Sequence, residues 1–226
     1  MRFKIFLNEM SASKKNGITF FDIDETLYHT FAKIKVIKDG KVVRELDNQE
    51  FNTYKLKDGE SYNFDEFKDA KLFTKTSIPI EKTINRVKKM LSSISTKGKH
   101  SKIVFLTARE DFDDKRTFLK RFKMDGIDID KIYVERAGNI RTGTIAERKK
   151  KIIMKYLDSG KYLKVRMVDD DMTNLRIFLS IKDEIPESVY DSIRKFYKDD
   201  TLGAKDMEFY ALLVTDSGKL KLVNKS

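Results

Sequence analysis

The chain has 226 residues, 40% of them apolar and including 16 Phe and 9 Tyr, which suits one sizeable core and excludes a disordered protein. It has no cysteine and only two histidines, which excludes disulfides and thiol nucleophiles and leaves little for a zinc cluster or a serine-type triad. No stretch approaches the roughly 18 apolar residues of a membrane helix and no secretory signal is evident, so we expect a cytoplasmic protein without a membrane partner.

The formal net charge is +11, and the basic residues recur in clusters. A surface of this kind favours polyanions and phosphates. The alternative is that the lysines keep the protein soluble and cover helix faces, and charge alone does not decide between the two. The clusters span residues 86–89, 97–102, 115–123 and 148–151.

The first ten residues, MRFKIFLNEM, carry apolar side chains at helical spacing. This pattern predicts a short helix within residues 1–12 that docks on the domain. The segment also resembles the leaders by which some large tailed bacteriophages direct proteins into their heads, where a protease cuts after a leucine-x-glutamate step. Leu7, Asn8 and Glu9 would match that step. This second interpretation implies a phage-encoded protein of the host cytoplasm that is packaged into the virion.

The stretch FFDIDETL, residues 20–27, places Asp22, Asp24 and Glu25 directly after the apolar run 18–21, which predicts a buried strand. Two carboxylates about 4 Å apart repel by roughly 4 kcal/mol at the effective dielectric of a partly buried site. This much like charge beside a core requires a cation or a proton. The stretch therefore predicts a metal ion.

Residues 28–75 interrupt the alternation of strands and helices. IKVIKDGKVVREL and YKLKDGESYNF each predict a hairpin with an Asp-Gly turn, at 39–40 and 58–59. Because this β-rich insertion follows Asp22 closely, we expect a small cap over the carboxyl ends of the strands; an ordinary extension of the sheet is the alternative. The expected core then comprises residues 1–27 and 76–226.

Apolar runs alternate with amphipathic patterns through the rest of the chain. Helical spacing covers 80–91 and 112–122, Gly126 suits a helix stop, and a capping box at 144–147 opens a third helix. Uninterrupted apolar runs between the helices suit a parallel sheet that is covered on both faces. We therefore expect an α/β protein with a Rossmann-like, doubly wound parallel sheet. The predicted strands are 18–21, 103–106, 132–134 and 163–168, and the tail, 208–223, predicts a further hairpin with no assigned chemistry.

Polar side chains follow three of the predicted strands. Asp22 ends the first, Thr107 ends the second, and residues 169–171, all aspartates, end the fourth. Open α/β sheets bind ligands beyond the carboxyl ends of their strands, so these groups are expected to converge. Which two of the three late aspartates face the metal stays open, and Asp171 is expected to cap the next helix.

A lysine is expected to join this cluster. At about 100° per residue, Lys149 lies at the centre of an apolar helix face, Lys150 lies at its edge and Lys151 points away. A buried ammonium without a partner is costly, so Lys149 should meet negative charge.

The ordered set FDIDETL, FLTAR, a lysine opening a helix and VDDD resembles the haloacid dehalogenase superfamily, in its phosphotransferase branch. All four family motifs appear in order between residue 18 and about residue 180. The dehalogenases of the family lack the second aspartate of the first motif, whereas its phosphatases keep it, and here it is Asp24.

The resemblance implies an aspartyl-phosphate mechanism. Asp22 would attack phosphorus, and Asp24 would protonate the leaving oxygen and then activate water. Thr107 would donate to a phosphoryl oxygen, and Lys149 would neutralise charge on the intermediate. Ala108 and Arg109 would complete the substrate contacts with Thr107 and Lys149.

The resemblance also implies a magnesium ion as cofactor. Its ligands would be the Asp22 carboxylate, the backbone carbonyl of Asp24 and the pair Asp169 and Asp170, with water and phosphate completing six oxygens.

The expected activity is magnesium-dependent hydrolysis of a phosphomonoester, with a nucleotide or a nucleic-acid 3′-phosphate as candidate substrates. A catalytically idle module that binds phosphate or nucleic acid is one alternative. A phosphotransferase or mutase of the same fold is another. The sequence specifies neither the physiological substrate nor the oligomeric state.

Overall fold

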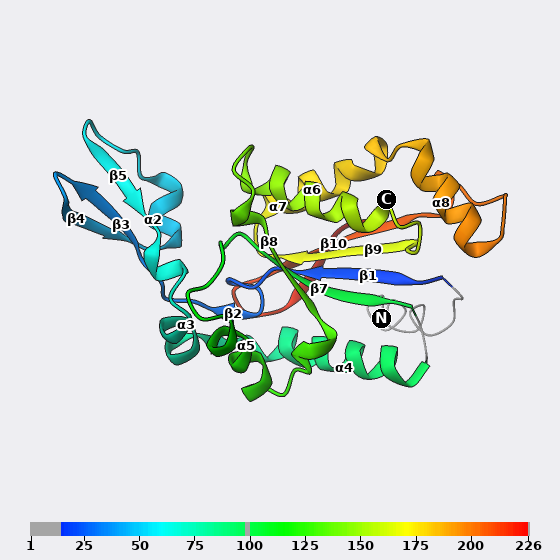
Figure 1. The fold of residues 1–226 in the computed structure, drawn as a ribbon, viewed down its shortest axis with the longest axis horizontal. Helices are drawn as coiled ribbons and strands as arrows, with labels where there is room; N and C mark the ends of the chain where they lie inside the picture. The colour runs from blue at the N-terminus through cyan, green and yellow to red at the C-terminus, as the bar shows by residue number, and fades with distance from the viewer. Residues whose placement is uncertain (1–14, 98–99, 226) are drawn as a thin grey trace.

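A six-stranded sheet lies at the centre of the computed structural model, which describes residues 15–97 and 100–225 (Figure 1). In spatial order its strands are β11 (Leu220–Lys225), β10 (Glu208–Val214), β9 (Lys164–Asp169), β1 (Gly17–Phe21), β7 (Lys102–Thr107) and β8 (Tyr133–Arg136). Neighbouring strands run parallel except β10 and β11. The predicted α/β class with a mostly parallel sheet is therefore confirmed, and each of the four predicted sheet strands overlaps an observed one.

Helices cover both faces of this sheet (Figure 1). One face carries α6 (Ile145–Leu157), α7 (Met172–Ser180) and α8 (Glu187–Tyr197), and the other carries α4 (Glu81–Lys97) and α5 (Lys115–Met124). Alternate residues of β1 serve the two layers: Phe20 packs in the first core and Phe21 in the second. Because both faces of the sheet are buried, the strands are apolar runs in the sequence and do not alternate with polar residues.

The helix ends follow the predicted signals. Thr144 caps α6 in a capping box with Glu147, and Asp171 caps α7 by accepting a hydrogen bond from the Thr173 amide. Gly126 follows α5 with φ 76°, a left-handed conformation that glycine adopts without steric cost. The two N-caps mark where the loops that lead into α6 and α7 end.

The tail forms the predicted hairpin, β10 with β11, but its first strand also pairs parallel to β9. The hairpin therefore extends the central sheet instead of standing apart from it.

The insertion begins at a two-stranded ribbon of β2 (Tyr28–His29) and β6 (Ile78–Pro79). Beyond it, β3 (Ile34–Lys38), β4 (Lys41–Leu46) and β5 (Glu60–Asn63) form a separate sheet in the order β4-β3-β5 (Figure 1). This sheet has a small core of its own, made by Ile34, Val36 and Leu46. Helix α3 (Ala70–Thr76) packs instead on the body of the protein, because Phe73 lies in the core beneath α4 and α5.

The second predicted hairpin is wrong. Residues 34–46 form the first hairpin, with Asp39 and Gly40 both at positive φ, but β5 pairs with β3 and not with the residues before Gly59. Helix α2 (Asn48–Thr53), opened by a capping box at Asp47, occupies part of the intervening chain. The Glu60 carboxylate then accepts hydrogen bonds from the Tyr54 hydroxyl and from the Lys57 amide, so this stretch closes as a turn.

No helix among residues 15–97 and 100–225 combines the length and the apolar character needed to cross a membrane. The leader or docking helix predicted for residues 1–12 lies outside the described residues.

Candidate functional site

Three carboxylates meet at the carboxyl ends of the two central strands. Asp22 directly follows β1, Asp169 is the last residue of β9, and Asp170 comes next. One oxygen from each lies within 4.8 Å of the others. Asp22 and Asp169 are buried, at 6% and 0% exposure, whereas Asp170 is exposed. The pair of late aspartates that joins Asp22 is therefore Asp169 and Asp170, because Asp171 caps α7.

Lys149 lies among these acids. Its Nζ donates to Asp22 Oδ1 at 2.6 Å and to Asp169 Oδ2 at 2.8 Å, and the residue is 2% exposed. Lys150 pairs with Glu184 at the surface, and Lys151 donates to the Thr142 hydroxyl. Helical geometry thus identified the lysine that the structure brings to the aspartates.

The charges of this cluster shift one another's protonation. Burial raises the pKa of Asp22 well above its usual value, against the opposing charge of Lys149. Desolvation of its carboxylate, together with the charge of Asp169, raises the pKa of Asp170 to about 7. Burial alone would lower the pKa of Lys149, but the charges of Asp169 and Asp22 outweigh burial and raise it. The lysine is therefore charged, but its single positive charge does not balance the three carboxylates.

Neighbouring amide and hydroxyl groups orient the late aspartates. Asn174 Nδ2, in α7, donates to Asp169 Oδ1 at 3.0 Å and to Oδ2 at 3.2 Å. The Thr26 hydroxyl donates to Asp170 Oδ1 at 3.1 Å. Asn174 was not predicted from the sequence, although its position in the first turn of the helix that follows the triplet was an available signal.

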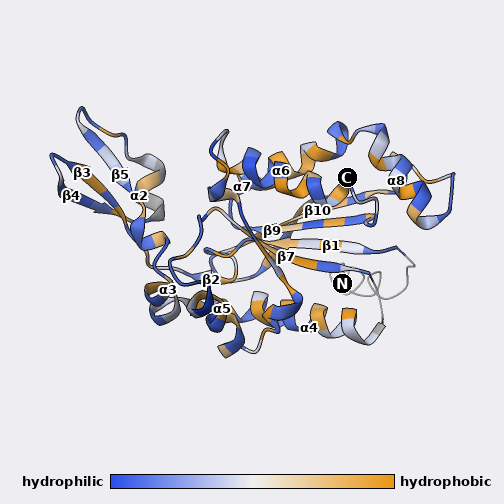
Figure 2. Cartoon of the chain, viewed as in Figure 1, coloured by the Kyte–Doolittle hydropathy of each residue, from blue (hydrophilic) through white to orange (hydrophobic). Residues whose placement is uncertain are grey.

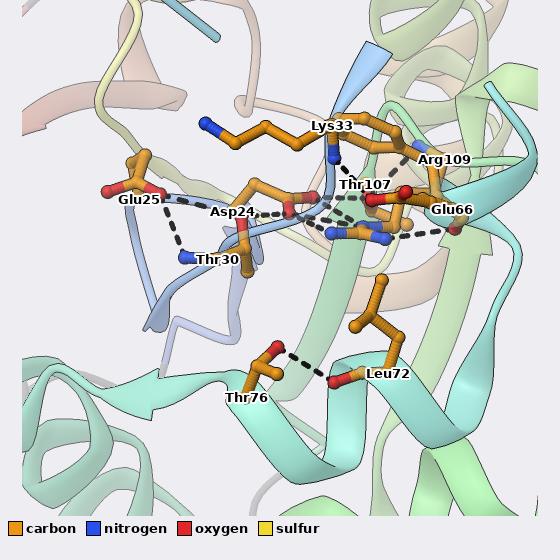
Figure 3. Close-up of polar contacts among 10 residues, drawn as sticks. Asp24, Glu25, Thr30, Lys33, Glu66, Leu72, Thr76, Thr107 and Arg109 are labelled. Carbon is orange, nitrogen blue, oxygen red and sulfur yellow. Dashed lines mark hydrogen bonds and ion pairs between the residues drawn. The ribbon is translucent and has the colours of Figure 1, made fainter. Parts of the chain in front are cut away.

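Asp24 points to a different cation, Arg109 (Figure 3). Arg109 Nη2 donates to Asp24 Oδ1 at 2.6 Å, and Nε donates to Oδ2 at 3.0 Å. The remaining Nη1 donates to the carbonyl of Phe67, in the insertion, at 2.9 Å. Arg109 is 4% exposed, and in this arrangement its guanidinium binds Asp24 and the insertion. A direct contact of Arg109 with substrate stays a prediction.

The Arg109 fork holds Asp24 in its charged form. Burial would raise the pKa of Asp24, but the charge and hydrogen bonds of Arg109, with the Thr30 hydroxyl 2.8 Å from Oδ1, lower it overall. Thr107 Oγ1 lies 3.4 Å from Asp24 Oδ2 and accepts a hydrogen bond from the Arg109 amide. Thr107, the last residue of β7, is buried, whereas Ala108, the next residue, is exposed.

The turn after Asp24 is held by Glu25, which has a φ of 50°. One Glu25 oxygen accepts a hydrogen bond from the Thr30 amide at 2.9 Å, and the other lies 2.8 Å from His29 Nδ1. Glu25 thus fixes the backbone that presents the Thr30 hydroxyl to Asp24 (Figure 3). Neither Thr30 nor its contact with Asp24 was predicted from the sequence, because the two residues lie on opposite arms of this turn.

The donor set suits a hard divalent cation. Asp22, Asp169 and Asp170 supply carboxylate oxygens only, and oxygen donors of this kind favour magnesium, calcium or manganese over softer metals. The Asp24 carboxylate belongs to the Arg109 ion pair, so this residue has only its backbone carbonyl to offer an ion.

The phosphate-related positions predicted from the sequence divide into two groups. Lys149 lies with Asp22, Asp169 and Asp170, whereas Thr107 and Arg109 lie with Asp24. The two groups adjoin because Asp22 and Asp24 are two residues apart on the same loop.

In comparisons with known proteins, no family model, no curated protein and no solved structure matches this chain.

Proposed function

We propose that this chain is a magnesium-dependent phosphomonoester hydrolase of the haloacid dehalogenase type, with Asp22 as nucleophile. One observation carries the proposal: a buried lysine lies between the first-strand aspartate and a late aspartate, with a third carboxylate beside them. A core that needed only packing would not concentrate these charges, because buried charges are costly unless they are compensated.

The reaction would proceed in two transfers. An Asp22 oxygen attacks phosphorus, the bond from phosphorus to the ester oxygen breaks, and that oxygen takes a proton from Asp24. Water then attacks phosphorus, gives its proton to Asp24 and releases Asp22 and inorganic phosphate. The Arg109 ion pair favours the charged Asp24 of the second transfer, and the first transfer requires Asp24 to be protonated beforehand.

The remaining groups supply positive charge. Asp22, Asp169 and Asp170, with the Asp24 backbone carbonyl, would hold magnesium, which offsets negative charge on the phosphoryl oxygens. Lys149 would compensate Asp22 before it attacks and the phosphorylated intermediate afterwards. Thr107 would donate to a phosphoryl oxygen once substrate displaces its long contact with Asp24.

The test is hydrolysis of p-nitrophenyl phosphate by the purified protein with and without magnesium. Asp22→Asn should abolish turnover, because an amide cannot form the acyl phosphate. Asp171→Asn is the matched control: it changes a nearby aspartate whose role is helix capping, a role that asparagine also fills. Mass spectrometry of acid-quenched wild type should find phosphate on the peptide that contains Asp22.

An active Asp22→Asn variant would refute the covalent mechanism. Wild type that is inert towards a broad panel of phosphate esters would favour the phosphate-binding module instead. Phosphate appearing on an added alcohol, in place of free phosphate, would favour the phosphotransferase.

A further inference from the structure

We propose that helices α3 and α5 form a docking face for a nucleic acid strand whose terminal phosphate enters the site. This inference rests on the proposed function, because it names the substrate class of that same site. The face is made by Lys71 and Lys75 of α3 and by Arg116 and Lys120 of α5, four exposed cations on neighbouring helices. These four residues are called the α3–α5 basic face.

The two helices pack side by side, which places their cations together. Thr74 Oγ1 donates to the Thr117 carbonyl at 3.1 Å, and Arg121 Nη1 donates to the Thr74 carbonyl at 3.2 Å. Phe73 and Phe118 lie beneath this contact, with ring centroids 5.2 Å apart. The line along which the helices touch and the direction of the core are therefore both fixed.

Helical geometry then orients the four cations. Lys71 and Lys75 lie on the side of α3 away from buried Ala70 and Phe73, next to the line of contact with α5. Arg116 and Lys120 lie correspondingly on α5, away from its buried phenylalanines. Each pair is spaced four residues apart, about one turn or roughly 6 Å of rise, so each helix presents two charges in a row.

The cations of this face are not locked in ion pairs, although Lys71 acts electrostatically on Asp114. In the part of the chain that the structure describes, none of the four side chains forms an ion pair. The nearby acids are engaged at helix starts: Asp69 accepts from the Leu72 amide, Asp113 from the Ala70 amide, and Asp114 from the Arg116 and Thr117 amides. Figure 2 shows hydrophilic residues on both helices.

The face adjoins the site through Arg109. The Arg109 guanidinium, paired with Asp24, donates to the Phe67 carbonyl, and α3 begins shortly after Phe67, at Ala70. The loop that follows Thr107 and carries Arg109 leads directly into α5, and its Asp113 amide donates to the Lys68 carbonyl. The N-terminal ends of α3 and α5 are therefore the ends nearest to Arg109 and Asp24, and the proposal places the end of the strand there.

Nucleic acid is the polyanion that fits both features. Rows of cations contact successive backbone phosphates without reading sequence, and the reaction proposed for the adjoining site acts on a phosphate ester. An acidic polypeptide would match the charges of the face but would bring no phosphate monoester to Asp22. The competition experiment below separates these two partners.

The test measures fluorescence anisotropy of a labelled single-stranded DNA oligonucleotide with a 3′-hydroxyl end, which the proposed reaction cannot hydrolyse. The test variant is Lys71→Gln, Lys75→Gln, Arg116→Gln and Lys120→Gln together. The matched control removes the same charge from exposed lysines outside these two helices, by Lys155→Gln, Lys161→Gln, Lys195→Gln and Lys205→Gln. Lys195 lies on α8, which covers the opposite face of the central sheet from α5 (Figure 1).

The test variant should bind the oligonucleotide at least ~10-fold more weakly than wild type, and its salt slope should fall by up to about 3, as four lost phosphate contacts predict for a single strand. The control should keep both affinity and slope. Circular dichroism and thermal unfolding of both variants verify that they fold. The same oligonucleotide with 3′- or 5′-phosphate shows which end the site prefers.

Equal weakening in both variants, or wild type without affinity for the oligonucleotide, would overturn the proposal. Competition by polyglutamate as strong as that by unlabelled DNA of equal charge would also overturn it. Because binding is measured without turnover, it separates failure of the docking face from failure of the phosphatase, which p-nitrophenyl phosphate reports on wild type.

Discussion

Replacing Lys149 with methionine tests the charge balance of the buried cluster directly. At an effective dielectric of about 20, contacts of 2.6 and 2.8 Å correspond to attractions of about 6 kcal/mol each. Desolvation of the three groups offsets much of this attraction, and breaking a buried ion pair typically costs about 3–5 kcal/mol. Methionine matches the stem of lysine in shape, so the loss reports the charge. We expect metal-free Lys149→Met to lose about 3–5 kcal/mol of unfolding free energy at neutral pH.

Magnesium should restore part of that loss, because a divalent cation replaces the missing positive charge among Asp22, Asp169 and Asp170. Lowering the pH should also reduce the loss, since neutral carboxyl groups need no ammonium partner. The assay is urea unfolding followed by far-UV circular dichroism, with and without magnesium. Circular dichroism suits this chain because it contains no tryptophan.

Lys150→Met is the matched control, because it removes the adjacent lysine, whose partner Glu184 lies at the surface. Surface pairs contribute about 0–1 kcal/mol, so this variant should lose no more than that and should not respond to magnesium beyond wild type. Equal stability of the two variants, with no additional response of Lys149→Met to magnesium, would refute the charge balance described for the site.

Three further changes have defined outcomes. Arg109→Ala should lower kcat for p-nitrophenyl phosphate roughly 100-fold, because it releases Asp24. Arg109→Lys should recover little of this loss, because lysine lacks the forked guanidinium. Full activity of either variant would contradict this role of Arg109. The folded-state pKa of Asp170 is raised to about 7, so its carboxyl group loses its proton more readily in the unfolded chain. Metal-free wild type should therefore lose stability relative to Asp170→Asn as pH rises from about 4 to 7. The assay is the urea midpoint of both proteins at stepped pH, and a gain in the stability of wild type over this range would contradict the prediction. Gly126→Ala should cost roughly 1–2 kcal/mol in thermal unfolding because of its φ of 76°, whereas Gly203→Ala, with open space around it, should cost less.

The parts of the site that could be predicted from the sequence are those set by strand ends and helix periodicity. Asp22 and Asp169 follow apolar runs, and parallel strands deliver their carboxyl ends to one edge of the sheet. Lys149 follows from angular position alone, because only one of three consecutive lysines lies at the centre of the apolar face. These inferences need no knowledge of how distant segments pack.

The contacts that could not be predicted depend on such packing. Arg109 meets Asp24 across 85 residues, and its fork also reaches Phe67 in the insertion. The FLTAR stretch indicates an arginine near the site but not which acid it pairs with. The second hairpin failed for a related reason, since the Asp-Gly turn at 58–59 is local, whereas the choice of β3 as partner for β5 is not.

Separate cations reduce the repulsion between Asp22 and Asp24 that the first-strand stretch implies. The two carboxylates are directed to different cations, Lys149 for Asp22 and Arg109 for Asp24, although the charge of Asp24 still adds to burial in raising the pKa of Asp22. With Asp169 and Asp170 included, four carboxylates face two cations, which leaves two negative charges when all are ionised. One divalent cation would neutralise that remainder. Without it, the excess negative charge adds to desolvation in favouring protonated acids: desolvation, followed by the charge of Asp169, raises the pKa of Asp170 to about 7.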